Sequence, residues 1–296
     1  MFCVKIKTRG DFMKLAVKSC AKINLTLEIT GKREDGYHLI NSVFQSVSLC
    51  DSLTVEAQTA KNNEITCKTD YLINDNICEK AARLFLQKTN ITGVVQITLN
   101  KHIPVAAGLG GGSSNAAAVL LSLNKIFDFP LNNNELLELA EKLGADVPFF
   151  LNGGTQHVYS IGEKTETVEN NTSYALVLIK NSTKPSTAEM YKKLDSIGVT
   201  TNNNNTENLI KAIKENNYNL FCQHISNDFE NVLNETEIKQ DLINGGANTA
   251  CLSGSGPTVF GVFENKEKAM VAYNNLKEKY QNVYLAEPTS SAILFE

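Results

Sequence analysis

The sequence lacks the features that define several large classes of protein. No apolar run approaches the ~18 residues that a membrane-spanning helix needs. The seven cysteines are scattered, odd in number and include no C-x-x-C pair, so neither a disulfide framework nor a zinc site is indicated. We therefore expect all of them to be free thiols in a reducing cytosol.

The sequence also has no excess of positive charge. The net charge of -4 and the isoelectric point near 5.7 argue against nucleic-acid binding, which usually needs a basic face. The 42% hydrophobic and 20% charged residues are typical of a globular protein, and 296 residues suffice for two domains.

The first residues do not resemble a signal peptide. In residues 1–14, no apolar stretch follows the basic side chains. We interpret residues 1–12 as an extension before the first strand, with Met13 as an alternative start, and we expect a cytoplasmic protein.

Hydrophobic periodicity predicts a chain of the α+β class without internal repeats. Apolar and polar residues alternate from Leu15 to Ile29, which is typical of a half-buried strand. The other expected strands lie within 42–57, 93–100, 174–180, 249–263 and 282–288. Helices are expected near 76–88, 113–127, 131–144, 188–195, 207–215, 218–232, 235–243 and 265–280.

One stretch, "PVAAGLGGGSSNAAA" at 104–118, places four glycines between an expected strand and an expected helix. Glycines are entropically costly unless the chain needs positive φ or a close approach to a ligand. The stretch is not G-x-G-x-x-G, because Ser113 takes the third glycine position, and no lysine follows as in a P-loop. Converging N–H groups at a helix N-terminus, with donors from the serines and Asn115, favour a cradle for nucleotide phosphates. The alternative is a flexible surface loop before a capped helix.

Four segments, taken in order, resemble the motifs of the GHMP kinase superfamily. They are "AKINLTLEITGKREDGYHLINSVFQ" at 21–45, "KHIPVAAGLGGGSSNAAA" at 101–118, "GADVPFF" at 144–150 and "CLSGSGPTVFGVF" at 251–263. The resemblance implies an ATP-binding domain like ribosomal protein S5 domain 2 in residues 1–160. It also implies a ferredoxin-like, substrate-side domain in residues 161–296, with the active site in the cleft between the two.

The implied activity is phosphorylation of a small-molecule alcohol by ATP, with Mg²⁺ bridging the phosphates through protein ligands that stay unknown. The "GKREDGYH" segment at 31–38 is similar to members that phosphorylate the 2-hydroxyl of a methylerythritol bearing cytidine diphosphate, in non-mevalonate isoprenoid synthesis. Two alternatives stay open: a kinase for mevalonate or homoserine, and a silent homologue that binds nucleotide and regulates a partner. We expect no nucleic-acid or membrane partner, and either a monomer or a homodimer.

The resemblance also implies the catalytic residues. Lys22 would stabilise charge on the transferred phosphoryl group, and Asp146 would accept the proton of the attacking hydroxyl. Lys22 and Asn24 lie two apart, so their side chains share one face of the strand. The alternatives are a solvated Lys–Asn pair and an Asp146 that caps a short turn.

The binding residues follow from the same resemblance. The expected ATP-binding residues are Asn76, Lys101, Pro104, Val105, Ala106, Ala107, Gly108, Leu109, Gly110, Gly111, Gly112, Ser113, Ser114 and Asn115. The expected substrate-binding residues are Asn24, Tyr37, His38, Ser186, Thr187, Gly254 and Ser255, with Tyr37 and His38 at a cytosine base. Structural alternatives are a helix cap for Asn76, a strand-edge lysine for Lys101, a partly buried Tyr37–His38 pair and a hairpin turn at 254–256.

Overall fold

The structure is a computed structural model that describes residues 12–70, 76–180, 183, 185–198, 203–233 and 235–296. Residues 1–11 of the predicted N-terminal extension lie outside the described residues. Among the helices of the described part, none is both long and apolar enough to cross a membrane.

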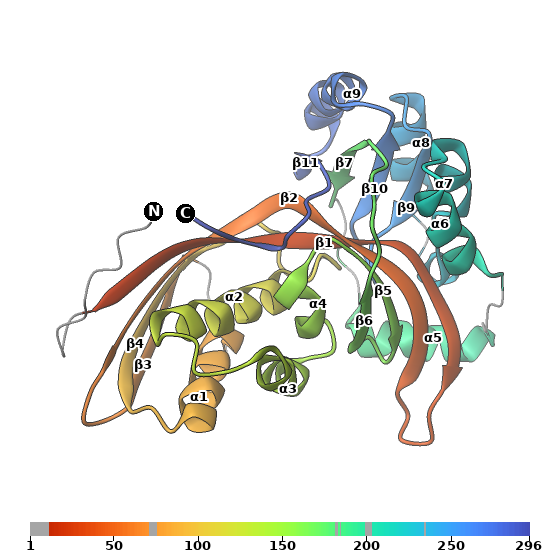
Figure 1. The fold of residues 1–296 in the computed structure, drawn as a ribbon. Helices are drawn as coiled ribbons and strands as arrows, with labels where there is room; N and C mark the ends of the chain where they lie inside the picture. The colour runs from red at the N-terminus through yellow and green to blue at the C-terminus, as the bar shows by residue number, and fades with distance from the viewer. Residues whose placement is uncertain (1–11, 71–75, 181–182, 184, 199–202, 234) are drawn as a thin grey trace.

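An eight-stranded sheet is built around two long antiparallel strands, β1 (Met13–Lys32) and β2 (His38–Thr59). Its main order is β12-β1-β2-β4-β3, with β3 (Glu64–Thr69), β4 (Gly93–Asn100) and β12 (Ile293–Phe295). Beside this path, β5 (Thr155–Ser160) pairs with β2 and β6 (Lys164–Thr167), and β8 (Ser226–Asn227) pairs with β1. Figure 1 shows β1 and β2 curving through the whole molecule.

Four helices pack beneath this sheet (Figure 1). They are α1 (Ile77–Thr89), α2 (Gly111–Ile126), α3 (Asn133–Leu143) and α4 (Val147–Asn152). α2 packs against β1, β2 and the other three helices, and it is buried from Ser114 through Leu120. The third helix begins after an asparagine cap at Asn132 and ends before Gly144, within the range that the sequence predicted.

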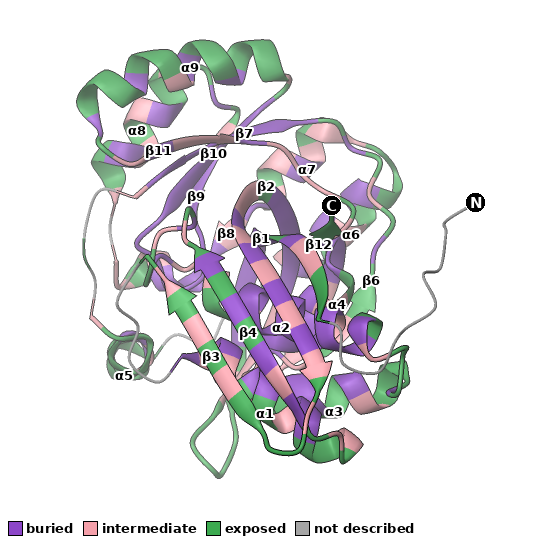
Figure 2. Cartoon of the chain, turned by 90° about the vertical axis from the view of Figure 1, so that its left-hand side faces the viewer, coloured by how far each residue is buried: buried purple, intermediate pink, exposed green. Residues whose placement is uncertain are grey.

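A second, four-stranded antiparallel sheet has the order β11-β7-β10-β9. Its strands are β7 (Ala175–Ile179), β9 (Thr249–Leu252), β10 (Val259–Phe263) and β11 (Val283–Ala286). The wholly apolar β7 lies inside this sheet, which is typical of an uninterrupted apolar strand. α8 (Thr236–Asn244) and α9 (Lys266–Lys279) cover it and leave a mostly exposed outer surface (Figure 2).

The remaining helices are α5 (Thr187–Ile197), α6 (Asn205–Lys214) and α7 (Tyr218–His224). The single helix predicted over 218–232 is wrong, because the chain leaves the helix at Ile225 for β8 and a 3-10 turn, η1 (Asp228–Asn231). The Asn227 side chain donates to the carbonyls of Leu252 and Gly254. These tertiary hydrogen bonds override the helical periodicity.

The prediction that the first strand is half-buried is also wrong. β1 is buried at every residue from Ser19 to Ile29, including Lys22 and Asn24. Its apolar residues are divided between two hydrophobic cores: Val17 and Leu27 belong to one, and Ile23 to the other. The buried polar positions of β1 require partners, and the partners of Lys22 belong to the site described below.

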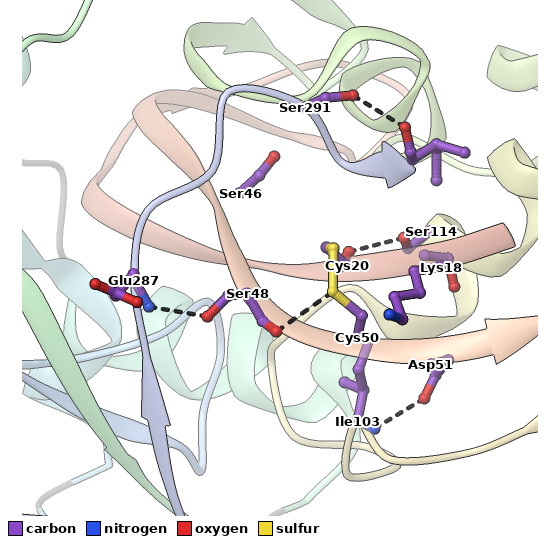
Figure 3. Close-up of a disulfide and its surroundings, with 12 residues drawn as sticks. Lys18, Cys20, Ser46, Ser48, Cys50, Asp51, Ile103, Ser114, Glu287 and Ser291 are labelled. Atoms are coloured by element: carbon purple, nitrogen blue, oxygen red, sulfur yellow. Dashed lines mark hydrogen bonds between the residues drawn. A yellow bond between two sulfur atoms is a disulfide. The ribbon is translucent and has the colours of Figure 1, made fainter. Parts of the chain in front are cut away.

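The prediction that all cysteines are free is wrong as well. The structure joins Cys20 and Cys50 in a disulfide (Figure 3). The two residues are direct partners on the adjacent strands β1 and β2, so the sheet register brings them together. A separation of 30 residues in sequence gives no sign of that register. Of the other described cysteines, Cys67, Cys78, Cys222 and Cys251 are free.

Candidate active site

The glycine-rich loop forms the wall of a cavity at the N-terminus of α2. Positive φ angles of 53°, 77° and 67° at Ala106, Gly108 and Gly110 turn the chain tightly before the helix begins at Gly111. The backbone N–H of Lys22 donates to the Leu109 carbonyl at 3.0 Å. This bond ties the loop to β1.

The space beside this loop, which we call the glycine-loop cavity, has a volume of about 370 Å³. Every predicted ATP-binding residue except Ser114 lines it. The Ser114 hydroxyl instead donates to the Cys20 carbonyl at 2.7 Å (Figure 3). The cavity therefore lies at the positive end of a 16-residue helix, where backbone N–H groups favour an anion.

A buried ionic cluster supports this cavity from behind. Asp51 is fully buried, forms an ion pair with Lys101 and accepts hydrogen bonds from the backbone N–H groups of His102 and Ile103. Asn115 donates to the same carboxylate at 2.9 Å. Asp51 thus contacts residues on both sides of the loop, and no sequence motif singled it out. Asn76 has two roles. Its side chain caps α1 by accepting a hydrogen bond from the Cys78 N–H at 3.0 Å, and it also lines the glycine-loop cavity.

A larger cavity of about 600 Å³ adjoins the glycine loop, and we call it the Lys22–Asp146 cavity. Gly108 and Gly110 line both cavities, so the two meet at the loop. Both predicted catalytic residues line the larger cavity, together with Asn24, Tyr37, His38, Thr187, Gly254 and Ser255 from the predicted substrate set. Ser186 is not among its lining residues, because it is the exposed N-cap of α5.

Lys22 and Asp146 face each other at the junction of the two cavities. The Lys22 Nζ lies 3.6 Å from Asp146 Oδ2, donates to Asn24 Oδ1 at 2.7 Å and lies 4.1 Å from the centre of the Phe44 ring. Burial lowers the pKa of the Lys22 ammonium, and the neighbouring Asp146 carboxylate partly offsets this shift. Asp146 precedes α4 but makes no side-chain capping bond. Its carboxylate is thus available to a ligand in the cavity.

The far wall of the larger cavity is formed by α5. Thr187, Tyr191 and Asp195 follow one another at intervals of four residues and all line the cavity. The Thr187 and Ser255 hydroxyls are 3.1 Å apart, which links α5 to the glycine turn after β9. Sequence reasoning found Thr187 and missed Tyr191 and Asp195. The spacing of four from Thr187 along a predicted helix was the signal that could have found them.

The comparisons with known proteins agree with this geometry. Residues 76–154 match the family "GHMP kinases N terminal domain", and residues 201–282 match "GHMP kinases C terminal". A Clostridium botulinum (strain Langeland) protein named 4-diphosphocytidyl-2-C-methyl-D-erythritol kinase is 41% identical, covering 90% of this chain and 98% of that protein. A protein of the same name from Clostridium novyi is 40% identical with the same coverage.

Solved structures give the same result for the fold. A crystal structure of 4-(cytidine 5'-diphospho)-2C-methyl-D-erythritol kinase matches with a TM-score of 0.77 and 28% identity, over 93% of this chain and 99% of that one. Homoserine kinase from Cytophaga hutchinsonii matches with a TM-score of 0.76 over 99% and 100% of the two chains, and its 17% identity shows only the common fold. The chain, an α+β protein, therefore belongs to the GHMP kinase family.

Proposed function

We propose that this chain transfers the γ-phosphoryl group of ATP to the 2-hydroxyl of 4-diphosphocytidyl-2-C-methyl-D-erythritol. The products are ADP and the 2-phosphate, an intermediate of the non-mevalonate isoprenoid route. The observation that carries the proposal is the Lys22–Asp146 pair at the point where the two cavities meet. A phosphate donor in one cavity and an alcohol in the other would have their reacting ends beside this pair.

Each cavity suits one of the two ligands. In the glycine-loop cavity, the loop N–H groups and the N-terminus of α2 would hold the ATP phosphates, with Asn76 and Lys101 at its rim. In the Lys22–Asp146 cavity, Tyr37, His38 and Tyr191 offer aromatic surface for a nucleobase. Tyr37 is 61% exposed, so it is accessible to a ligand and does not serve as core.

Asp146 and Lys22 would have different roles in the phosphoryl transfer. Asp146 accepts the proton of the 2-hydroxyl as that oxygen attacks phosphorus, and the Lys22 ammonium stabilises negative charge that develops on the transferred group. Because Lys22 is buried, water competes little for its charge. Asn24 receives one hydrogen bond from Lys22 and donates another to Ser42 at 3.2 Å, which holds the ammonium in place.

We propose Mg²⁺ as the companion of ATP. Within the described ranges, no group of three or more His, Cys, Asp or Glu side chains is arranged to hold a metal ion. The described side chains therefore fit an ion that is held mainly by phosphate oxygens and water, as Mg²⁺ commonly is. When bound, the ion would neutralise charge on the β- and γ-phosphates. We also propose a cytoplasmic location, while the choice between monomer and homodimer stays open.

A coupled assay of ADP release tests the proposed function. The purified chain is given ATP, Mg²⁺ and one acceptor at a time: the diphosphocytidyl substrate, mevalonate or homoserine. We expect turnover with the diphosphocytidyl substrate and a kcat/KM at least on the order of 10² lower with the other two, because they lack the base that the aromatic wall would bind. A preference for mevalonate or homoserine would show that the substrate is another alcohol. ATP binding without turnover would indicate a catalytically silent homologue.

A further inference from the structure

The Cys20–Cys50 disulfide lies beside the groups that hold the glycine loop (Figure 3). Asp51 follows Cys50 in the chain, and its buried carboxylate contacts both the segment before the loop and the helix after it. On the other strand, the Cys20 carbonyl accepts a hydrogen bond from the Ser114 hydroxyl at 2.7 Å. Each half of the disulfide is therefore directly connected to the support of the loop.

The disulfide also joins β1 and β2 where their pairing is irregular. Cys20 pairs with Cys50, but the next residue of β1, Ala21, pairs with Val47. Residues 48–49 of β2 are skipped in this register and form a bulge, where the ladder of hydrogen bonds between the two strands is interrupted. The covalent bond thus fixes the two strands at a point that their backbone hydrogen bonds fix only weakly.

The two sulfur atoms differ in their access to solvent. Cys20 is fully buried, whereas Cys50 is half-buried. The Cys50 Sγ lies 3.4 Å from the Ser48 carbonyl oxygen (Figure 3), and a free thiol at this position can donate a hydrogen bond to that oxygen. The site therefore accommodates the reduced pair as well as the disulfide, and a thiol from solvent reaches Cys50 first.

We propose that Cys20 and Cys50 form a reversible thiol–disulfide site that tightens ATP binding when it is oxidised. The closed disulfide ties the bulge to β1, so Asp51 holds the glycine loop ready for the phosphates. When the bond opens, the bulge gains freedom and the loop is less well ordered. The inference rests on the proposed function, which places ATP at this loop, and on the proposed cytoplasmic location, where disulfides are mostly transient and redox-sensing.

Exchange with a small thiol such as glutathione supplies the chemistry. A thiolate attacks the Cys50 Sγ, the S–S bond breaks, and Cys20 leaves as a thiolate that takes up a proton. A second thiolate attacks the glutathione sulfur of the mixed disulfide, so Cys50 is released and protonated. The two cysteines gain two electrons and two protons, and two glutathione molecules become one disulfide. Oxidation by glutathione disulfide follows the same steps in reverse.

The test measures ATP affinity by calorimetry with Mg²⁺ and without an acceptor, after equilibration of the protein with oxidised or reduced glutathione. The oxidised wild type should bind ATP at least about fivefold more tightly, the lower end of ordinary coupling between two sites. Peptide mapping should find Cys20 cross-linked to Cys50 in the oxidised protein and both thiols free in the reduced protein. Cys50→Ser should bind ATP with the affinity of the reduced wild type in both buffers.

A matched control is Cys222→Ser. Cys222 is also half-buried, but it is a free thiol on α7, packs against the second core and lines neither cavity. This variant should keep the full redox response. The thermal midpoint shows whether each variant folds, and Cys50→Ala replaces Cys50→Ser if the hydroxyl disrupts the fold.

Thermodynamic linkage gives a second measurement that needs no variant. If the disulfide favours ATP binding, ATP must favour the disulfide by the same factor. In the wild type, saturating ATP should therefore lower the equilibrium constant for reduction by glutathione at least about fivefold. Thiol labelling across a series of glutathione buffers, with and without ATP, measures this constant.

The outcomes separate the inference from the proposed function. A wild type that binds no ATP in either form overturns the proposed function and the inference with it. Equal ATP affinity of the two forms overturns the inference alone, as does a disulfide that glutathione cannot reduce in the folded protein. A redox response that persists in Cys50→Ser also overturns it. That response would belong to another thiol, such as Cys67, whose Sγ accepts from Asn76 at 3.3 Å.

Discussion

At the scale of single residues, the site depends on a lysine in an environment that disfavours its charge. Lys22 is 4% exposed, and burial is the largest influence on its lowered pKa. Asp146, Asn24 and the Phe44 ring supply the compensating interactions. An ammonium that is poorly hydrated but well oriented interacts strongly with phosphoryl oxygens, so the cost of burying Lys22 is consistent with a catalytic role.

Replacing Asp146 tests this role directly. We expect Asp146→Asn to lower kcat by a factor on the order of 10² to 10⁴, because the amide cannot accept the hydroxyl proton as a base. The KM for ATP should stay close to the wild-type value, since Asp146 lines only the larger cavity. Steady-state kinetics with both substrates, beside a thermal melt, measures the effect. Turnover within a few-fold of the wild type would remove Asp146 from the mechanism.

Much of the residue-scale geometry could be predicted, because motif residues were carried over position by position. The structure brings Lys22, Asn24 and Asp146 together as expected, whereas their catalytic roles stay predictions. Asp51 and Asp195 were missed for a physical reason. Their contacts join partners 50 residues apart for Asp51–Lys101 and 157 apart for Asp195–His38, which no local pattern encodes. The spacing of four from Thr187 could have placed Asp195 on the same helix face, but it gives no sign of the contact with His38.

At the scale of elements, the glycines of the loop have different functions. A Cβ on Gly108 would lie 2.2 Å from the Ser253 carbonyl oxygen, and φ there is +77°. A Cβ on Gly112 would meet no atom closer than Ile77 Cγ2 at 4.0 Å, and φ there is not in the left-handed region. Gly108 is thus required by the fold, whereas Gly112 is required only if a ligand approaches its backbone.

The contrast predicts opposite behaviour for two variants. Gly112→Val should keep the thermal midpoint nearly unchanged and raise the KM for ATP on the order of tenfold or more, because the branched side chain would occupy space meant for phosphate oxygens. Gly108→Ala should lower the stability by at least ~1–3 kcal/mol, because positive φ and a backbone clash both oppose it. Calorimetry and ATP titration of both proteins check this. Unaltered ATP affinity in Gly112→Val would mean that the loop holds no phosphate.

Periodicity predicted most elements, and its failures share a cause. The helices at the glycine loop and after Asn132, and the strands of the second sheet, lie close to the expected positions. The strands β3, β5 and β6 were missed because they are mostly polar, and β12 because it has only three residues, whereas the equally short strands of the second sheet are mostly apolar. The break at Ile225 was missed because partners on β9 and β1, distant in sequence, determine it.

At the scale of the whole molecule, the two hydrophobic cores share their central strands. β1 contributes Val17 and Leu27 to one core and Ile23 to the other, and β2 likewise contributes Phe44 and Val43 to different cores. The proposed division into residues 1–160 and 161–296 stays a prediction. Because the same two strands belong to both cores, we expect the described chain to unfold as one cooperative unit.

The chain end offers a test of that cooperativity. β12 pairs with β1 through Ser19↔Ile293 and Lys18↔Leu294, next to the strand region that carries Lys22. Ile293 is 8% exposed and Leu294 is 40% exposed, so neighbouring residues of one strand point to the core and to the surface. Ile293→Ala should destabilise the protein by about 2–3 kcal/mol, at the lower end of the range for a buried isoleucine, and Leu294→Ala by about 0.5 kcal/mol or less.

Both variants should still unfold in a single transition when followed by far-ultraviolet circular dichroism and by tyrosine fluorescence. The reason is that weakening β12 weakens β1, and β1 cannot leave one core without leaving the other. If Ile293→Ala instead separated the two probes into distinct transitions, the second sheet would be folding independently of the first. The shared strands would then be a connection between two autonomous domains, and the proposed catalytic pair, Lys22 on β1 and Asp146 just before α4, would depend on the first domain alone.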